Sequence, residues 1–161
     1  MIERKYEFTE ETKKFCGRIP HRIRAVRSFN GVKKGDLGGF IKSEDNLSHN
    51  GMAWVYLGTR VYDTARVYGN AQIYGDARIY GKTDYITVEQ IGSRFDTTTF
   101  FKTANSEIYV SCGCFRGSIT EFREKVKKTH GVDTKYAKVY QSAANLAEMQ
   151  ILDREVDLHE M

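Results

Sequence analysis

The sequence predicts a mainly β protein whose centre is a coil of short parallel strands. Three observations predict this fold: a six-residue repeat over residues 53–82, a glycine-rich segment before it, and a hairpin with two amphipathic segments after it. A fixed short period is a stronger fold signal than local propensity, so the repeat decides the prediction. The expected domains are an N-terminal β cap (1–46), the repeat coil (47–88) and a module of a β-hairpin and two helices (89–161).

Five hexapeptides fill the repeat, each with an aliphatic residue followed directly by a tyrosine. The aliphatic residues are Val55, Val61, Val67, Ile73 and Ile79, and the tyrosines are Tyr56, Tyr62, Tyr68, Tyr74 and Tyr80. Six is a multiple of the two-residue period of a strand, and Gly, Asn or Asp closes most hexapeptides, as a turn requires. Three hexapeptides per coil would stack residues 18 apart: Val55 with Ile73, Val61 with Ile79, and Val67 with Tyr85.

This spacing resembles the hexapeptide-repeat, left-handed parallel β-helix over about residues 47–88, although that family often has glycine where this chain has tyrosine. The resemblance implies a prism that packs along its axis into a homotrimer. A prism of fewer than three coils buries little surface alone, and repeat arrays need caps or partners. We expect the outward tyrosines to stack between coils, where they either stiffen the sheet or form the subunit interface. The expected interface residues are Tyr56, Tyr62, Tyr68, Tyr74, Tyr80, Arg60 and Arg78.

Arg60 and Arg78 are also 18 residues apart, so the same stacking places one above the other. Two like charges at this spacing repel. We therefore expect an acidic group from a neighbouring molecule, or a bound anion, beside them.

The composition is that of an ordinary globular chain, with 40% hydrophobic and 29% charged residues. No run approaches the roughly eighteen apolar residues of a membrane helix, and the charged start is not a signal peptide. We therefore expect no membrane partner. Three cysteines, an odd number, favour a reducing cytoplasm. The net charge of +4 is uneven, because residues 1–42 carry eleven Lys/Arg against five Asp/Glu. This imbalance permits an anionic ligand but is also typical of solvated surfaces.

The N-terminal cap contains two predicted strands, at residues 6–8 and at residues 21–29, the second as an edge strand with outward arginines. The following loop has Lys33 and Lys34 beside Gly35. Backbone N–H groups in such a loop can hold phosphate, but the spacing matches no phosphate-binding motif, and a plain turn is the preferred interpretation.

After the repeat, threonines and aromatics predict strands at residues 85–89, 98–102 and 107–112, the last two joined as a hairpin. Ser118 and Glu121 form a capping-box pattern that opens a helix over residues 119–129. Gly131 is suited to end that helix, and Asp133 to cap a second helix running toward residue 153.

The whole chain resembles a group of bacteriophage and prophage hexapeptide-repeat, or "polymer-forming", proteins. The residues that carry this resemblance are GDLGGFI (35–41), EDNLSHNG (44–51), the A-x-V-Y-G-N/D repeats, IGSR (91–94), GCFRG (113–117) and the later His130–Gly131. The resemblance covers residues 6–140 approximately. It implies a phage origin and a β-helix, but no reaction.

A candidate anion site follows the repeat, where hydroxyls, a glycine and arginines gather in the sequence. Hydroxyl, guanidinium and helix N-terminal N–H groups are the donors that bind phosphate. The predicted ligand-binding residues are Ser93, Arg94, Thr97, Thr99, Arg116 and Ser118. The alternative is a turn with strand threonines and one surface arginine.

Three further site hypotheses are weaker. Cys112, Cys114 and His130 are three potential zinc ligands, whereas structural zinc sites have four, so we predict no metal site. His49 occupies the repeat phase of Val55 and would be the general base of a hexapeptide-type acyltransferase if Glu44 or Asp45 oriented it. The mild charge and the lack of a reader motif argue against nucleic acid.

The sequence thus predicts a cytoplasmic, non-enzymatic phage protein without catalytic residues or cofactor. We expect it to bind and sequester a nucleotide-like anionic signalling molecule, countering host defence. One alternative is a module that blocks a host defence protein through its tyrosine-rich face. The other is the acyltransferase.

Overall fold

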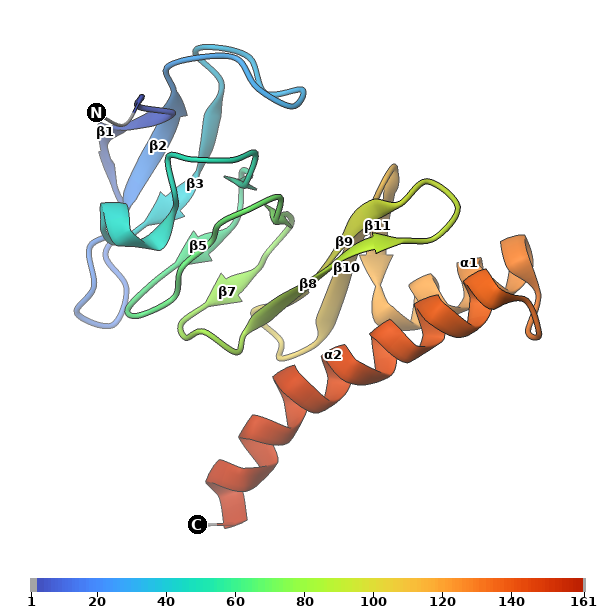
Figure 1. The fold of residues 1–161 in the computed structure, drawn as a ribbon. Helices are drawn as coiled ribbons and strands as arrows, with labels where there is room; N and C mark the ends of the chain where they lie inside the picture. The colour runs from blue at the N-terminus through green and yellow to red at the C-terminus, as the bar shows by residue number, and fades with distance from the viewer. Residues whose placement is uncertain (1–2, 161) are drawn as a thin grey trace. The chain divides into compact units, whose positions relative to one another are not determined.

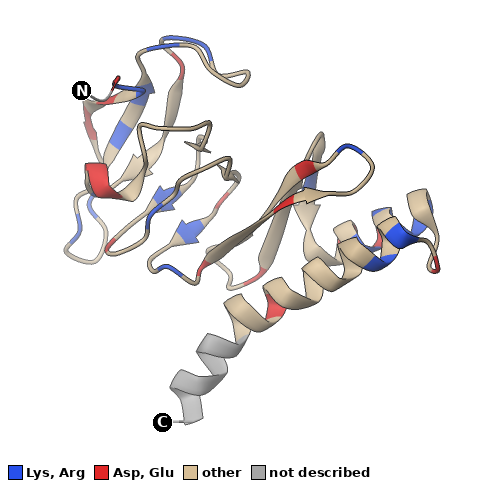
Figure 2. Cartoon of the chain, viewed as in Figure 1, with Lys and Arg blue, Asp and Glu red and all other residues tan. Residues whose placement is uncertain are grey.

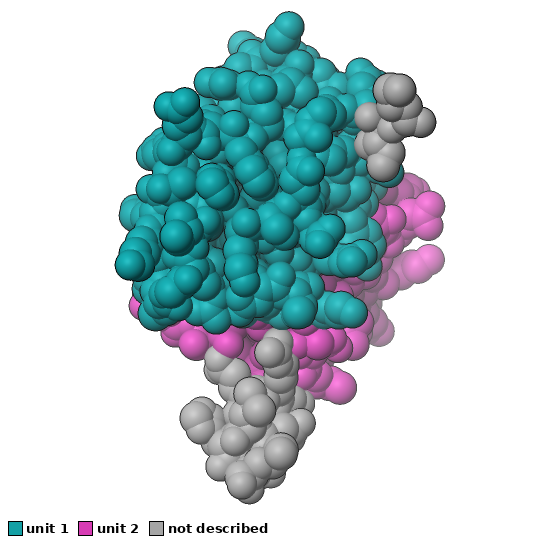
Figure 3. Space-filling model, turned by 90° about the vertical axis from the view of Figure 1, so that its left-hand side faces the viewer, with its two compact units in different colours: residues 1–82 teal, residues 83–161 magenta. Residues whose placement is uncertain are grey.

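Two compact units make up the chain, Met1–Lys82 and Thr83–Met161, coloured separately in Figure 3. The computed structural model describes the backbone of residues 3–160 and the side chains of residues 3–152. Figure 1 shows a first unit of short strands and a second unit with a longer sheet and two helices. Each unit has its own set of buried apolar residues.

The first unit contains a five-stranded sheet in the order β1-β2-β3-β5-β7 and a two-stranded sheet, β4-β6. Its elements are β1 (Tyr6–Thr12), β2 (His21–Ala25), β3 (Leu37–Ile41), the 3-10 helix η1 (Glu44–Asn46), β4 (Trp54–Val55), β5 (Arg60–Val61), β6 (Gln72–Ile73) and β7 (Arg78–Ile79). Strands β1, β2 and β3 are antiparallel, whereas β3, β5 and β7 are parallel. Strand β2 therefore lies inside the sheet, and its prediction as an edge strand is wrong.

The predicted left-handed β-helix is wrong. Parallel pairing of residues 18 apart is confirmed for Val55 with Ile73 and for Val61 with Ile79. These pairs nevertheless belong to separate open sheets of two-residue strands, and no β-helix solenoid forms in residues 3–160. The third predicted pair also fails, since Val67 bridges Leu47 and Tyr85 opens an antiparallel pair with Phe101.

The repeat does not form a solenoid. It is short, and the segments on both sides of it form antiparallel strands instead of further coils. On the N-terminal side, the β1-β2-β3 hairpins extend the sheet that the repeat would have continued. On the C-terminal side, the sequence changes to a seven-residue strand that pairs with β9. The aliphatic residues of the repeat still face inward, and all five are fully buried.

Two glycines in β3 allow the repeat to pack closely against that strand. A Cβ on Gly39 would lie 2.5 Å from the Thr59 carbonyl oxygen, and one on Gly38 would lie 2.7 Å from that of Val55. These contacts are with backbone, which cannot rotate away. The GDLGGFI segment therefore places Gly38 and Gly39 directly against the backbone of Val55 and Thr59 in the repeat.

The glycine-rich loop before β3 is a plain turn, in agreement with the preferred interpretation. The backbone N–H of Lys33 donates to Asp36 Oδ2, and that of Lys34 donates to Ser28 Oγ. These amides are already satisfied by side chains of the loop itself.

The second unit is a four-stranded antiparallel sheet in the order β11-β10-β9-β8, with both helices on one face (Figure 1). Its elements are β8 (Tyr85–Ile91), β9 (Asp96–Lys102), β10 (Ile108–Cys112), β11 (Phe115–Ser118), α1 (Ile119–His130) and α2 (Lys135–Glu160). The predicted hairpin is confirmed as β9-β10. Strand β11 was not predicted, because its four residues lack an alternating pattern.

The predicted cap is correct for α1 but not for α2. The N–H of Glu121 donates to Ser118 Oγ and that of Ser118 to Glu121 Oε1, which confirms the capping box. Gly131 ends α1 with a φ of 79°. At the start of α2, the N–H of Ala137 donates to Thr134 Oγ1, so Thr134, rather than Asp133, caps this helix. Within the described residues, neither helix is long and apolar enough to cross a membrane.

Candidate functional site

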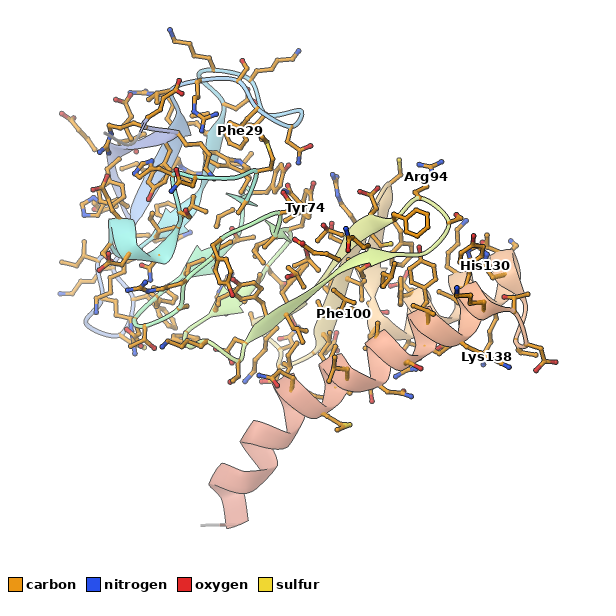
Figure 4. All side chains as sticks on the ribbon, in the orientation of Figure 1. Phe29, Tyr74, Arg94, Phe100, His130 and Lys138 are labelled. Atoms are coloured by element: carbon orange, nitrogen blue, oxygen red, sulfur yellow. The ribbon has the colours of Figure 1, made fainter. Side chains whose placement is uncertain are left out.

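A cavity of about 270 Å³ opens in the second unit between the β8-β9 turn, the β10-β11 turn and the two helices. It is lined by Ser93, Arg94, Asp96, Cys112, Gly113, Cys114, Phe115, Phe122, Lys125, Val126, Thr129, His130 and Tyr140. Figure 4 shows Arg94 on the β8-β9 turn and His130 at the end of α1, at the same end of this unit. The cavity therefore combines turns, which carry polar groups, with helices that supply an apolar wall.

The residues predicted from sequence to bind an anion divide between two faces of the sheet. Ser93 and Arg94 line the cavity. Thr98, rather than its neighbours, points to the helix-covered face, where its hydroxyl lies 3.3 Å from Cys112 Sγ. Because side chains alternate along a strand, Thr97 and Thr99 lie on the opposite face.

Arg116 and Ser118 are not part of the cavity lining either. Arg116 pairs with Ser111, which in turn pairs with Thr99, so these three residues share the face opposite the helices. The hydroxyl of Ser118 accepts the capping hydrogen bond of α1. The predicted six-residue set therefore does not converge on one ligand.

Tyr140 is the central residue of the cavity wall. Its ring packs edge-on against Phe122, with centroids 5.7 Å apart, and stacks on His130 at 5.8 Å. A Cβ on Gly92 would lie 1.7 Å from the Tyr140 hydroxyl oxygen, so only glycine permits this approach to the β8-β9 turn. Burial and the neighbouring Cys112 raise the pKa of Tyr140 to about 12. The hydroxyl is therefore protonated at neutral pH and able to donate a hydrogen bond.

The cavity lining has more cationic than acidic side chains. Arg94 and Lys125 are the cationic residues, and His130 adds an imidazole. Asp96 is the acidic residue of the lining. Lys125 and Tyr140 were missed in the sequence because they lie 31 and 46 residues after Arg94, on helices whose packing only the fold reveals.

Cys112, Cys114 and His130, considered above as metal ligands, all line the cavity. Nevertheless, no group of three or more His, Cys, Asp or Glu side chains among the described residues is arranged to hold a metal ion. All three cysteines are free thiols.

The repeat tyrosines stack in pairs as predicted, but they are not uniformly exposed. The ring centroids of Tyr56 and Tyr74 lie 4.0 Å apart, and those of Tyr62 and Tyr80 lie 5.0 Å apart. Tyr62 is fully buried, whereas Tyr68 is 65% exposed. The expectation that every repeat tyrosine points to solvent is therefore wrong for Tyr62.

The β1-β2 loop is the reason that Tyr62 is buried. The Phe15 ring stacks on Tyr62 with centroids 6.1 Å apart, and the Arg18 guanidinium lies 5.6 Å from the same ring. Arg18 is held there by two hydrogen bonds to Asp63, at 2.9 and 2.8 Å. The tyrosine-rich surface predicted to form the subunit interface is thus partly covered by the chain's own loop.

His49 is held by its neighbours in a structural arrangement. Its Nδ1 accepts a hydrogen bond from the Lys5 backbone N–H at 3.0 Å, and its ring stacks on Tyr6 at 4.1 Å. Its Nε2 lies 3.4 Å from Glu44 Oε1, so Glu44 is the nearby carboxylate that the acyltransferase hypothesis required. However, a base must accept a proton at a nitrogen that faces its substrate, and Nδ1 is occupied while Nε2 is buried.

Lys5 is fully buried beside this histidine and gives the first unit an unusual pH response. Its Nζ donates to the Ala53 carbonyl oxygen at 2.6 Å and lies 5.2 Å from the Phe29 ring. Burial and the positive charge of Arg27 lower the pKa of Lys5 to about 8. The unfolded chain, with an ordinary lysine pKa of about 10.4, binds more protons between these two values.

We therefore expect the free energy of unfolding of the first unit to rise between pH 8 and pH 10. The folded state releases the Lys5 proton in this range before the unfolded state does. Urea denaturation at pH 7.5, 8.5 and 9.5 measures this increase. Lys5→Met should flatten it, whereas Lys14→Met, at an exposed position, should leave it unchanged. Equal slopes in the wild type and Lys5→Met would contradict the assignment.

Comparison with protein-family models gave no match to this chain, and no curated protein sequence matched it significantly.

Proposed function

We propose that the second unit binds a small nucleotide-like anion in its cavity and holds it without chemical change. The observation that carries this proposal is the arrangement of Arg94, Lys125 and His130 around an aromatic wall in a cavity of about 270 Å³. This volume lies just below the range of about 300–1,000 Å³ that is typical of small-molecule pockets. It suits one mononucleotide-sized ligand.

The cationic residues would bind the phosphate. Guanidinium and ammonium groups form charge-assisted hydrogen bonds to phosphate oxygens, and Arg94 can do so in a bidentate manner. The Tyr140 hydroxyl adds a neutral donor, as a tyrosine is protonated at neutral pH and burial raises its pKa further, to about 12. Three groups on three different elements thereby reach the same space.

The aromatic residues would hold the base or another flat group. Phe115, Phe122 and Tyr140 present ring surfaces to the cavity, and Asp96 can accept hydrogen bonds from an amino or hydroxyl group of the ligand. A ligand with one anionic end and one flat, hydrogen-bonding end matches this distribution.

The biological role that we propose is sequestration of a signalling nucleotide in the cytoplasm of a bacterial host. It rests on the sequence resemblance of about residues 6–140 to phage proteins, although the β-helix that this resemblance implied does not form in residues 3–160. A binding protein of this kind lowers the free concentration of its ligand by occupancy alone.

Isothermal titration of the full chain with AMP, ADP-ribose and cyclic nucleotides tests the proposal. We expect saturable binding of at least one of them, and recovery of the unchanged ligand after incubation. Lys125→Ala and Arg94→Ala should each weaken binding by about tenfold or more, because each removes charge-assisted hydrogen bonds. Lys128→Ala is the matched control, because Lys128 is an exposed lysine on the same helix, α1, and does not line the cavity. The proposal fails if no nucleotide binds, or if Lys128→Ala weakens binding as much as Lys125→Ala.

A further inference from the structure

The outer face of the five-stranded sheet in the first unit carries a row of cationic and aromatic side chains. The strand register pairs Arg22 with Phe40, Phe40 with Arg60, and Arg60 with Arg78. Side chains of paired residues lie on the same face of a sheet. The adjacent residues Ile41, Val61 and Ile79 are fully buried, so the arginine row faces outward. Figure 2 shows the basic residues of β2, β5 and β7 on this sheet.

Two of the arginines on this face are neutralised within the unit. Arg22 forms an ion pair with Glu11 at 2.5 Å and lies 4.5 Å from the Phe40 ring. Arg18 forms an ion pair with Asp63 at 2.8 Å and covers the rings of Tyr62 and Tyr80. The carboxylates nearest these two arginines are therefore already engaged.

Arg60 and Arg78 have no such compensation. Neither forms an ion pair with a described carboxylate, and their Cα atoms occupy directly paired positions on parallel strands, about 4.8 Å apart. Burial, and then the charge of Arg60, lower the pKa of Arg78, while Asp76 offsets this in part. The two positive charges thus lie on neighbouring strands, and no described carboxylate forms an ion pair with either of them.

The hydrogen-bonding capacity of the pair is also largely unused. Arg78 Nη1 donates to the carbonyl oxygens of Gly58 and Ala77, both at 2.9 Å, which fixes the guanidinium and leaves its other N–H groups for an incoming acceptor. The described contact of the Arg60 guanidinium is with the Phe15 ring, at 5.7 Å. Arg60 and Arg78 occupy paired positions on neighbouring strands, so both guanidinium groups can reach the oxygens of one tetrahedral oxyanion.

We propose that Arg60 and Arg78 form a second anion site, which takes a phosphate group between them. The site is independent of the cavity in the second unit. Phe15 lies against Arg60, so the phosphate is either free or carried by a nucleoside whose base packs on this ring. A bound phosphate would offset the repulsion between Arg60 and Arg78, which their spacing in the sequence already predicts.

Nuclear magnetic resonance on the full, ¹⁵N-labelled chain tests this inference. Inorganic phosphate is titrated at constant ionic strength against a chloride reference, while the Nε–H signals of Arg60 and Arg78 are followed. We expect a saturable shift of both signals with phosphate. A stronger response to AMP than to phosphate identifies a nucleotide as the carrier, whereas equal responses identify the free ion.

Three variants separate the alternatives. Arg60→Gln should weaken phosphate binding at Arg78 by about tenfold or more, since the charge-assisted hydrogen bonds of one guanidinium are lost. Lys14→Gln removes an exposed charge from the neighbouring loop and should leave binding unchanged, and so should Lys125→Ala in the cavity. The last variant separates this site from the proposed function, which can fail or hold independently.

Two results would overturn the inference. The first is a shift that grows linearly with phosphate, or one that Arg60→Gln leaves intact, because either indicates general surface attraction. The second is an oligomer, measured by light scattering, that Arg60→Gln converts to a monomer while phosphate has no effect. In that case carboxylates of a second copy provide the counter-charge.

Discussion

Trp54→Ala is expected to destabilise the first unit by about 3–5 kcal/mol, the usual cost of removing a large buried aromatic side chain. Trp54 is 1% exposed. Its ring packs edge-on against Phe29, with centroids 5.3 Å apart, and against Tyr6 at 6.5 Å. Gly38 lies directly beneath it, since a Cβ there would be 2.8 Å from the ring. The backbone strands around this ring cannot collapse into the space that it leaves.

Circular dichroism during urea denaturation measures this loss, because Trp54 is the only tryptophan and its removal eliminates the fluorescence probe. Met52→Ala is the control: it removes a side chain that is 42% exposed, two residues before Trp54 and outside strand β4. We expect its effect to be within about 0.5 kcal/mol of zero, as for other surface substitutions. Similar losses for both variants would mean that Trp54 is not the centre of this core.

Phe122→Ala is expected to have a comparable effect on the second unit, about 3–5 kcal/mol, and to change the cavity as well. Phe122 is 3% exposed and contacts three other rings, with centroids 5.8 Å from Phe100, 5.7 Å from Phe115 and 5.7 Å from Tyr140. Its removal therefore weakens the core below the helices and removes support from Tyr140. Ligand binding should decline even under conditions in which the variant remains folded.

Phe95→Ala provides the matched control, because it deletes the same side chain at a position that is 71% exposed on the β8-β9 turn. Thermal unfolding and nucleotide titration are measured on both variants. A Phe122→Ala protein with an unchanged melting temperature, or with unchanged affinity when folded, would contradict the role assigned to this ring.

The features that sequence analysis predicted correctly are those set by neighbouring residues or by a fixed period. Ser118 and Glu121 are three residues apart and form the capping box by themselves. The pairing of Val55 with Ile73 follows from the repeat length alone. The closed β-helix, in contrast, required the flanking segments to form further parallel coils, and they form antiparallel strands instead. Their hairpins compete for the same strand edges, and this competition is not visible in the repeat.

Only part of the candidate site was predicted correctly, because the prediction grouped residues that are close in the sequence. Ser93 and Arg94 lie in one turn, and that turn does line the cavity. Thr97 and Thr99 were grouped with them by closeness in sequence, although strand alternation directs them to the other face. Lys125 and Tyr140 reach the cavity only because α1 and α2 pack on the sheet, a contact over long sequence separation. Burial of Tyr62 likewise depends on a loop more than forty residues earlier.

The short strands of the repeat also affect how the protein behaves at high concentration. An exposed sheet edge is a template on which other chains add strands and aggregate, and long, flat, apolar edges are the most hazardous. The edge strand β7 is only two residues long, and one of those residues is Arg78. Such an edge offers an incoming strand few backbone hydrogen bonds beside a positive charge. We therefore expect β7 to be a poor template for the addition of strands from other chains.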